Sequence, residues 1–251
     1  MVSFLKMLFT SSVGRKYIVG ITGLALVAFV LVHMVGNLQM FAGTPDKINA
    51  YAVLLKSNMF VLWGFRLGLL TCAVLHVWFA ILLWTENKVA KEITYEDGKV
   101  YKASLASRTM TVSGTIVLAF IVFHILHFTT HTIYPDYSTF EAPLHGQYVH
   151  DVYFMVIEGF SVWYVSAFYI ISVGLLSLHL SHGIASIFQT LGLKNKKNEC
   201  FFNALAKIIA IILFLGFASI PVAVLTGVIK AQGDPSSEIY NESNTNSLPE
   251  L

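Results

Sequence analysis

The sequence predicts an all-α integral membrane bundle of five transmembrane helices. Of its 251 residues, 56% are hydrophobic and only 12% are charged, and the mean hydropathy is +0.69. A soluble domain usually has about 25% charged residues, so the surplus apolar surface must face something other than water. Five apolar runs are each long enough to cross a bilayer. Within lipid a chain must satisfy its own backbone hydrogen bonds, and runs of this length do so as helices.

The five runs are separated by more polar segments. They cover residues 17–41, 59–84, 110–131, 162–184 and 208–229. The first run is too long for the apolar core of a signal peptide, and no small-x-small cleavage site follows it. Residues 1–16 are predicted to form a short interfacial helix that ends in the charges anchoring the first span. Residues 1–231 then make up the membrane domain, and the polar tail 232–251 is expected to be disordered and external.

Basic residues set the expected orientation of the bundle. Twelve of the sixteen Lys and Arg residues lie in the N-terminal segment and in the loops after the second and fourth spans. The segment between the third and fourth spans has none. Because basic residues gather on the cytoplasmic side, we expect a cytoplasmic N-terminus and an external C-terminus. The expected location is a bacterial-type cytoplasmic membrane, crossed several times.

Cysteine usage excludes two kinds of redox centre. The chain has only Cys72, within the second span, and Cys200, on the predicted cytoplasmic side. We therefore expect no disulfide between them. No C-x-x-C-H sequence and no cysteine cluster occur, so neither covalently attached c-type haem nor an iron–sulfur cluster is expected in this chain.

Nine histidines occur, and seven of them lie within or at the ends of the predicted spans. Ionisable residues in hydrocarbon are costly and usually mark function, although a single one can be a neutral histidine hydrogen-bonded across a helix interface. Here the histidines follow an internal repeat, in which Gly precedes His by ten residues in the first and third spans and by eight in the second and fourth. The pairs are Gly23 and His33, Gly114 and His124, Gly68 and His76, and Gly174 and His182. The first two spans thus look like a weak copy of the third and fourth.

Depth in the membrane pairs the same histidines independently. Counted from the nearest cytoplasmic base, His33 and His124 lie 17 and 16 residues away, whereas His76 and His182 both lie 12 residues away. Two neutral imidazoles at one depth on different helices are what an iron bonded from both faces requires. Four histidines at two depths therefore predict two b-type haems.

His179 competes with His182 for the place in the fourth span. It lies 15 residues from the nearest base, a depth that also suits the His33 level. Being three residues away along a helix, it points roughly 60° away from His182. The internal repeat favours His182.

The remaining histidines and one arginine have open roles. His127 and His131 could contact a propionate or a quinone, but interfacial histidines are the simpler interpretation. His145 and His150 lie in the predicted external loop and receive no role. Arg66 lies near the outer end of the second span, where it suits either a haem propionate or simple snorkelling to the interface.

Four stretches of the sequence resemble the cytochrome b subunit of succinate:quinone oxidoreductases, in its single-chain, five-helix, dihaem branch. They are SSVGRKYIVGITG leading to LVHMVGNL, then LHVWFAILLW, SRTMTVSGTIVLAFIVFHILHF and LLSLHLSHGIASIFQTLG. Together they cover the first four spans, and their order is more specific than any one motif.

The resemblance implies a division of labour between the histidines. His76 and His182 would bind the haem nearer the cytoplasmic subunits, and His33 and His124 the farther one. The implied cofactors are two haem b groups and a quinone, with menaquinone slightly favoured. The implied partners are a flavoprotein subunit that interconverts succinate and fumarate and an iron–sulfur subunit on the basic face, with no nucleic acid. The chain would anchor both subunits in the bilayer and pass electrons to or from quinone, without a catalytic residue of its own.

Two features bear on proton transfer and on the inner face. Certain quinol:fumarate reductases of this family carry a Glu two residues before the fourth-span ligand, where this chain has Leu180, so we do not expect that proton route. Ser12 and Arg15, and likewise Ser107 and Arg108, suit a propionate or quinone site at the inner face. Plain anchoring at the interface explains them equally well.

Two other functions remain open. A dihaem cytochrome b of a formate dehydrogenase or hydrogenase would use the same histidines with other partners, a difference that neighbouring genes would reveal. A transporter would use them as metal ligands or proton relays. It would call for acidic residues at mid-membrane, and the cores of the first four spans contain no Asp or Glu.

Overall fold

The structure is a computed structural model and describes residues 2–92 and 105–231. The α-helices in this part are α1 (Val2–Thr10), α2 (Ser12–Asn37), α3 (Pro45–Lys56), α4 (Met59–Glu92), α5 (Leu105–Phe128), α6 (Val152–Ser161), α7 (Trp163–Thr190) and α8 (Glu199–Leu225). Two 3-10 helices, η1 (Leu38–Phe41) and η2 (Pro135–Thr139), and the strands β1 (Glu141–Leu144) and β2 (Gln147–His150) complete the elements. The strands form an antiparallel hairpin in which Glu141 pairs with His150.

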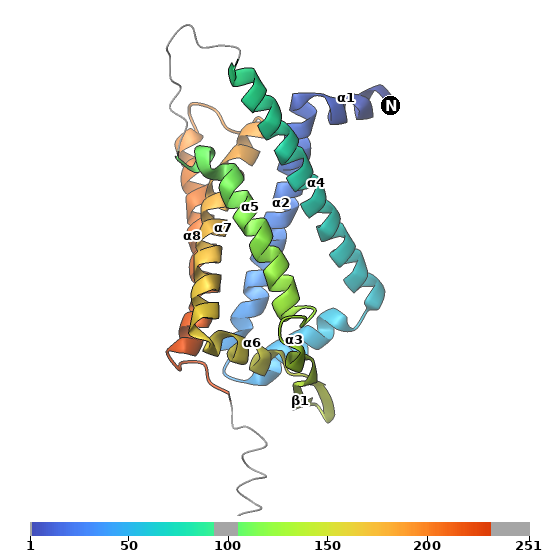
Figure 1. Cartoon of the computed structure of the whole chain (residues 1–251), viewed down its shortest axis with the longest axis vertical. Coiled ribbons are helices and arrows are strands. Elements are labelled where there is room, and N and C mark those ends of the chain that lie inside the picture. Colours follow the sequence, from blue (N-terminus) through green and yellow to red (C-terminus); the bar gives the residue numbers. More distant parts are fainter. Residues whose placement is uncertain (1, 93–104, 232–251) are drawn as a thin grey trace, which may run out of the picture.

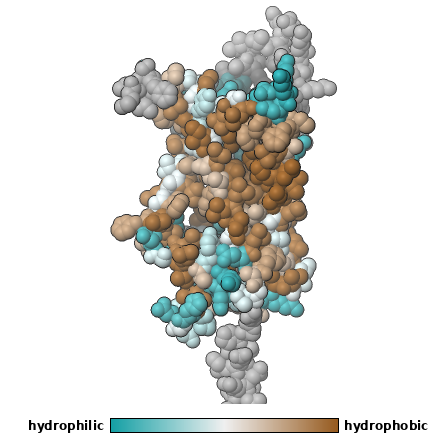
Figure 2. Space-filling view, turned by 180° about the vertical axis from the view of Figure 1, so that it is seen from behind, coloured by the Kyte–Doolittle hydropathy of each residue, from teal (hydrophilic) through white to brown (hydrophobic). Residues whose placement is uncertain are grey.

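Five of these helices are long and apolar enough to cross a membrane: α2 with η1, α4, α5, α7 and α8. They run up and down along the long axis of the molecule (Figure 1). Large apolar side chains cover much of their outer surface, and Figure 2 shows them as a broad hydrophobic band between more hydrophilic ends. Exposing such a surface to water is unfavourable, whereas contact with the hydrocarbon of a bilayer is favourable. The predicted all-α bundle with five apolar spans is confirmed.

The two ends of the bundle differ in character. We call the end that holds α1, the start of α2, the end of α4 and the α7–α8 loop the basic end, because these segments carry most of the described Lys and Arg residues. We call the opposite end, covered by α3, α6, η2 and the hairpin, the capped end (Figure 1). The tail 232–251, predicted to be disordered, lies outside the described residues, as does the segment 93–104 between α4 and α5.

The N-terminal helix is shorter than predicted. It ends at Thr10, and the backbone of Ser11 is extended, with φ −87° and ψ 147°. The Ser11 hydroxyl accepts a hydrogen bond from the Gly14 N–H at 3.0 Å, and an oxygen at this position caps a new helix. Arg15 and Lys16 therefore belong to the first turns of α2 and not to the end of the interfacial helix. Helix caps, which apolar periodicity does not report, explain the difference.

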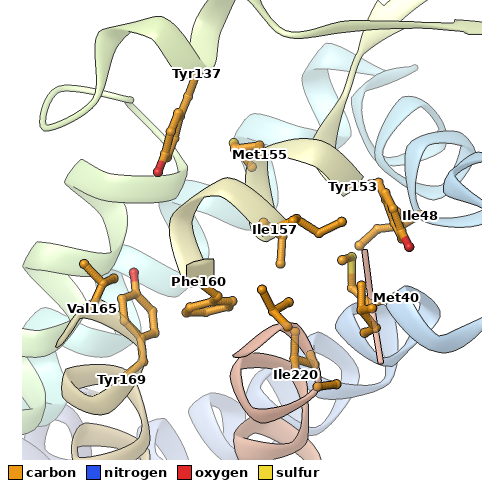
Figure 3. Packing of buried hydrophobic residues seen from close by; sticks show 14 of the residues in the cluster. Met40, Ile48, Tyr137, Tyr153, Met155, Ile157, Phe160, Val165, Tyr169 and Ile220 are labelled. Atoms are coloured by element: carbon orange, nitrogen blue, oxygen red, sulfur yellow. The ribbon is translucent and has the colours of Figure 1, made fainter. Parts of the chain in front are cut away.

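The principal core lies at the capped end. Figure 3 shows part of this cluster, in which side chains of α6 pack against η1, α3, η2 and the ends of α7 and α8. A second cluster fills the space between α2, α7 and α8 with Val27, Met34, Leu180, Ile184, Ala206 and Leu213. The helix α4, by contrast, packs on α2 along one side and exposes most of its other residues.

Asn49 joins α3 to α6 within the capped end. Its side chain is 1% exposed. It donates from Nδ2 to Oδ1 of Asp151 at 3.0 Å and accepts from the N–H of Tyr153 at 3.1 Å. Asp151 itself caps α6 by accepting from the N–H of Phe154 at 3.0 Å. One buried amide thus holds the start of α6 against α3.

We expect Asn49→Ala to destabilise the folded protein by about 1–3 kcal/mol, because the buried Tyr153 N–H loses its partner and the Asp151 carboxylate loses one of two. The measurement is thermal unfolding in detergent, followed by circular dichroism. Gln147→Ala is the control, since the exposed Gln147 side chain makes no hydrogen bond within the described residues. Equal unfolding midpoints for the two variants would contradict the role of Asn49.

Candidate functional site

His33 of α2 and His124 of α5 face each other inside the bundle. Their ring centres lie 5.9 Å apart, and the ring planes meet at 77°. Phe29 stacks on His33 with ring centres 5.4 Å apart, and Phe217 of α8 lies 5.9 Å from it. The structure therefore brings together the two histidines that sequence depth places at one level.

The spacing of this pair suits one metal atom between the two rings. Imidazole nitrogens bond transition metals at roughly 2.0–2.1 Å. Two such bonds on opposite sides of one atom hold the nitrogens roughly 4 Å apart and the ring centres somewhat farther apart. The observed separation of 5.9 Å between the ring centres is close to the roughly 6 Å that this arrangement requires.

The side chain of His76, on α4, packs against α2. Its Nδ1 lies 3.1 Å from the carbonyl oxygen of Val19 and 3.3 Å from the hydroxyl of Thr22. A Cβ placed on Gly23 would lie 3.1 Å from Cε1 of His76. The glycine is thus what allows the imidazole to lie this close to the α2 backbone.

His179 of α7 has matching surroundings on α5. Its Nδ1 lies 3.1 Å from the hydroxyl of Ser113. A Cβ on Gly114 would lie 3.2 Å from its Cε1. A hydroxyl residue followed by glycine therefore receives one histidine in each helical hairpin, α2–α4 and α5–α7. We call these two sequences, Thr22-Gly23 and Ser113-Gly114, the hydroxyl–glycine doublets.

His182 has different surroundings. It is half-buried, one turn nearer the basic end, and Lys194 is its charged neighbour. His179 interacts electrostatically with both His76 and His182, and its hydroxyl and glycine contacts are the ones that resemble those of His76. The match to His76 in this structure is His179.

The glycines that favour His182 in the sequence do not share an environment. A Cβ on Gly68 would have nothing within 4 Å, whereas a Cβ on Gly174 would lie 3.6 Å from the Phe214 ring. The eight-residue Gly–His spacing is thus a likeness of sequence without a likeness of packing. The ten-residue spacing differs, because Gly23 and Gly114 each receive a histidine.

Hydrogen bonds to Nδ1 leave Nε2 free on three of these histidines. A carbonyl oxygen accepts from Nδ1–H of His76, hydroxyl oxygens lie within reach of His76 and His179, and Tyr169 Oη lies 3.4 Å from Nδ1 of His124. A neutral imidazole with its proton on Nδ1 presents the lone pair of Nε2. Metal-bound histidines almost always donate their other ring N–H in this way, so the residues fit a haem held by paired imidazoles.

Arg66 does not face the histidine pairs. Its side chain is exposed on α4, and its guanidinium lies 5.3 Å from the centre of the Trp63 ring, a cation–π contact. This position agrees better with snorkelling than with a role as a propionate ligand.

The residues proposed for the inner face are partly engaged elsewhere. The Nε of Arg15 donates to the Phe9 carbonyl at 3.0 Å, and its guanidinium forms an ion pair with Glu86. Ser12 is exposed at the start of α2. Ser107 and Arg108 belong to α5, but their side chains lie outside the described ones. Close by, a cavity of about 350 Å³ is lined by Val13, Lys16, Tyr17, Ser186, Gln189 and Thr190.

Three other histidines gather at the capped end or beside it. His131 and His150 have ring centres 5.3 Å apart, and burial lowers the pKa of each below its usual value, which favours the neutral form at pH 7. His145 is exposed at the hairpin turn with φ +51°. Cys72 and Cys200 are free, as expected.

Sequence reasoning missed three residues of this site: Thr22, Ser113 and Tyr169. The first two carry a signal, because a hydroxyl residue precedes the repeat glycine in both the first and the third span. Tyr169 has none, being one of several aromatic residues in its span.

Comparisons with protein-family models, with curated proteins and with solved structures found no match to this chain. Function is therefore inferred from the histidines and their surroundings.

Proposed function

We propose that the chain is the membrane-anchor cytochrome b subunit of a succinate:quinone oxidoreductase and holds two b-type haems. His33 and His124 would hold one haem, which we call the outer haem. His76 and His179 would hold the other, the inner haem. The observation that carries the proposal is the facing of His33 and His124 across α2 and α5 at a separation suited to one iron. The two hydroxyl–glycine doublets support the inner pair.

In this proposal His179 takes the place that the sequence repeat gives to His182. Its ring has the same partners as His76, a hydroxyl at Nδ1 and a glycine at Cε1. His182 stays the alternative inner ligand, and the two are separated by the variants in the Discussion.

The chain's own contribution would be to position the two haems and to enclose them. A haem takes up and releases one electron at its iron. Four helices supply the imidazoles, and hydrogen bonds at Nδ1 fix three of the four rings, those of His76, His124 and His179. Aromatic side chains such as Phe29 and Phe217 surround the outer pair and keep water from it. The basic end would receive the iron–sulfur and flavoprotein subunits on the cytoplasmic side, and quinone would exchange electrons with the haems.

The first test is a reduced-minus-oxidised spectrum of the purified full chain, with haem measured as pyridine haemochrome. We expect two b-type haems per chain. A folded protein without haem would overturn the proposal and return the transporter to consideration. In native membranes, succinate is expected to reduce the haems. Reduction by formate or hydrogen instead would support the alternative partner complexes.

His33→Ala and His124→Ala are each expected to lower the haem content from two per chain to one, and both variants should retain the same haem. The reason is that each variant removes one of the two imidazoles that would hold that haem and leaves the other pair intact. Redox titration identifies which component survives. The double variant distinguishes the outcomes: if it lost both haems, the two histidines would belong to different sites.

A further inference from the structure

A buried hydrogen-bond chain runs from the outer histidine pair toward the capped end. The Nδ1 of His124 lies 3.4 Å from Oη of Tyr169, and Oη lies 2.9 Å from Nδ1 of His127. The side chain of His127 is fully buried. In Figure 3 the ring of Tyr169 stands beside Phe160, with its hydroxyl directed toward the side where Tyr137 lies. The proposed function uses the first of these contacts to hold the ring of His124 and gives His127 no role.

If His124 uses Nε2 for iron, the direction of its hydrogen bond to Tyr169 is fixed. Its Nδ1–H then donates to Tyr169. The hydroxyl proton of Tyr169 can then be donated to Nδ1 of His127, in the tautomer that carries its proton on Nε2. That Nε2 is buried and has no hydrogen-bond partner among the described residues. A hydroxyl that donates in this way becomes a better acceptor, because neighbouring hydrogen bonds polarise one another.

Packing fixes this arrangement. The ring of His127 stacks on Phe128 with centres 4.0 Å apart, and a Cβ on Gly159 would lie only 3.3 Å from its Cε1. Tyr134 and Tyr137 lie 5.2 and 5.6 Å from it, centre to centre. Burial raises the pKa of Tyr137 to about 12, so this neighbour stays uncharged. His127 therefore cannot turn away from Tyr169 without disrupting the core.

The first helical hairpin has neither the tyrosine nor the second histidine at the corresponding positions. Tyr169 precedes His179 by ten residues, and the residue ten before His76 is Arg66. His127 follows His124 by three residues, and the residue three after His33 is Gly36. Tyr169 and His127 therefore occur in only one of the two otherwise similar hairpins. This difference indicates a role other than packing.

We infer that Tyr169, backed by His127, is a positioning residue that fixes the ring of His124 and lowers the midpoint potential of the outer haem. This inference rests on the proposed function. An acceptor at Nδ1–H increases the basicity of the imidazole, and a more basic ligand favours the ferric over the ferrous iron. Removing the acceptor should therefore raise the potential of that haem and leave the other unchanged.

The test is a redox titration of the purified full chain, monitored in the b-type absorption band. Tyr169→Phe keeps the ring and removes only the hydroxyl, and we expect an upward shift of one component. Tyr153→Phe is the matched control, because its hydroxyl bonds to the Lys230 carbonyl, away from the histidine pairs. It should leave both potentials unchanged. Ser113→Ala should move the other component, since Ser113 contacts His179.

His127 supplies a second, independent pair of variants. His127→Leu deprives Tyr169 of its acceptor and should raise the same component by a smaller amount. His127→Asn places an amide oxygen near the former Nδ1 and should restore the wild-type potential. If Tyr169→Phe lost the outer haem, the potentials of His127→Leu and His127→Asn alone would decide whether the inference holds.

The possible failures are distinguishable. Wild-type protein without haem would overturn the proposed function itself. Two haems with unshifted potentials in Tyr169→Phe and in His127→Leu would overturn the role of Tyr169 and leave the proposed function intact. Equal shifts of both components, or a shift in Tyr153→Phe of the same size, would also overturn it.

Discussion

His179→Ala is expected to leave the purified protein with one b-type haem, whereas His182→Ala should retain both. His179 has the surroundings of His76, with a hydroxyl 3.1 Å from Nδ1 and the Gly114 position against Cε1. The half-buried His182 has Lys194 as its charged neighbour instead. Loss of one of two axial imidazoles should release the inner haem, because the pair supplies both bonds from protein to iron.

Haem content by pyridine haemochrome measures this effect, and circular dichroism shows whether each variant is still helical. His145→Ala is the control, since this histidine is exposed at the hairpin turn. The opposite pattern, with one haem in His182→Ala and two in His179→Ala, would restore the assignment that the sequence repeat favours. A loss in both variants would mean that His182 supports the site without bonding iron or that the region folds poorly, which circular dichroism separates.

Gly114→Val is expected to remove the inner haem, although no histidine is substituted. A Cβ at this position would already lie 3.2 Å from Cε1 and 3.7 Å from Nδ1 of His179, and valine adds two methyl groups beyond it. The imidazole must then move, and a ligand displaced by even 1 Å no longer holds its metal in the required geometry. Gly23→Val should act in the same way on His76, where the corresponding distance is 3.1 Å.

Gly68→Val is the matched control, because it makes the same change on a membrane-spanning helix where a Cβ meets nothing within 4 Å. We expect it to keep two haems. Haem content near one per chain in the Gly114 and Gly23 variants, against two in the control, is the expected result. Two haems in all three variants would show that the hydroxyl–glycine doublets are not part of the inner site.

The spans and the proximity of His33 to His124 can be predicted from the sequence for a physical reason. Lipid demands long apolar runs, so the spans can be read from composition alone. His33 and His124 are also found by depth, because each lies in a helix that starts near a basic residue and rises by a constant amount per residue. The structure then places their rings 5.9 Å apart.

Depth does not decide between His179 and His182. The two differ by three residues, which is less than one turn, and the face that each presents depends on how α7 is rotated about its axis. That rotation is set by packing against α5 and α8, which involves residues far away in the sequence. The cap of α3, α6 and the hairpin was likewise not predicted. Its helices are short and meet through side chains such as Asn49, whose partners are 102 and 104 residues away.

The hydroxyl–glycine doublets have a consequence for the ancestry of the fold. Each half of the chain, α2–α4 or α5–α7, contains one histidine of each proposed pair, at corresponding positions. Two identical copies of one such hairpin, related by a two-fold axis along the membrane normal, would therefore already hold both iron atoms on that axis. Gene duplication and fusion of this ancestor would then have freed the halves to diverge. In that ancestor the two sides of each haem would have been equivalent, and Tyr169 and His127, which occur in one half only, would have ended this equivalence at the proposed outer haem.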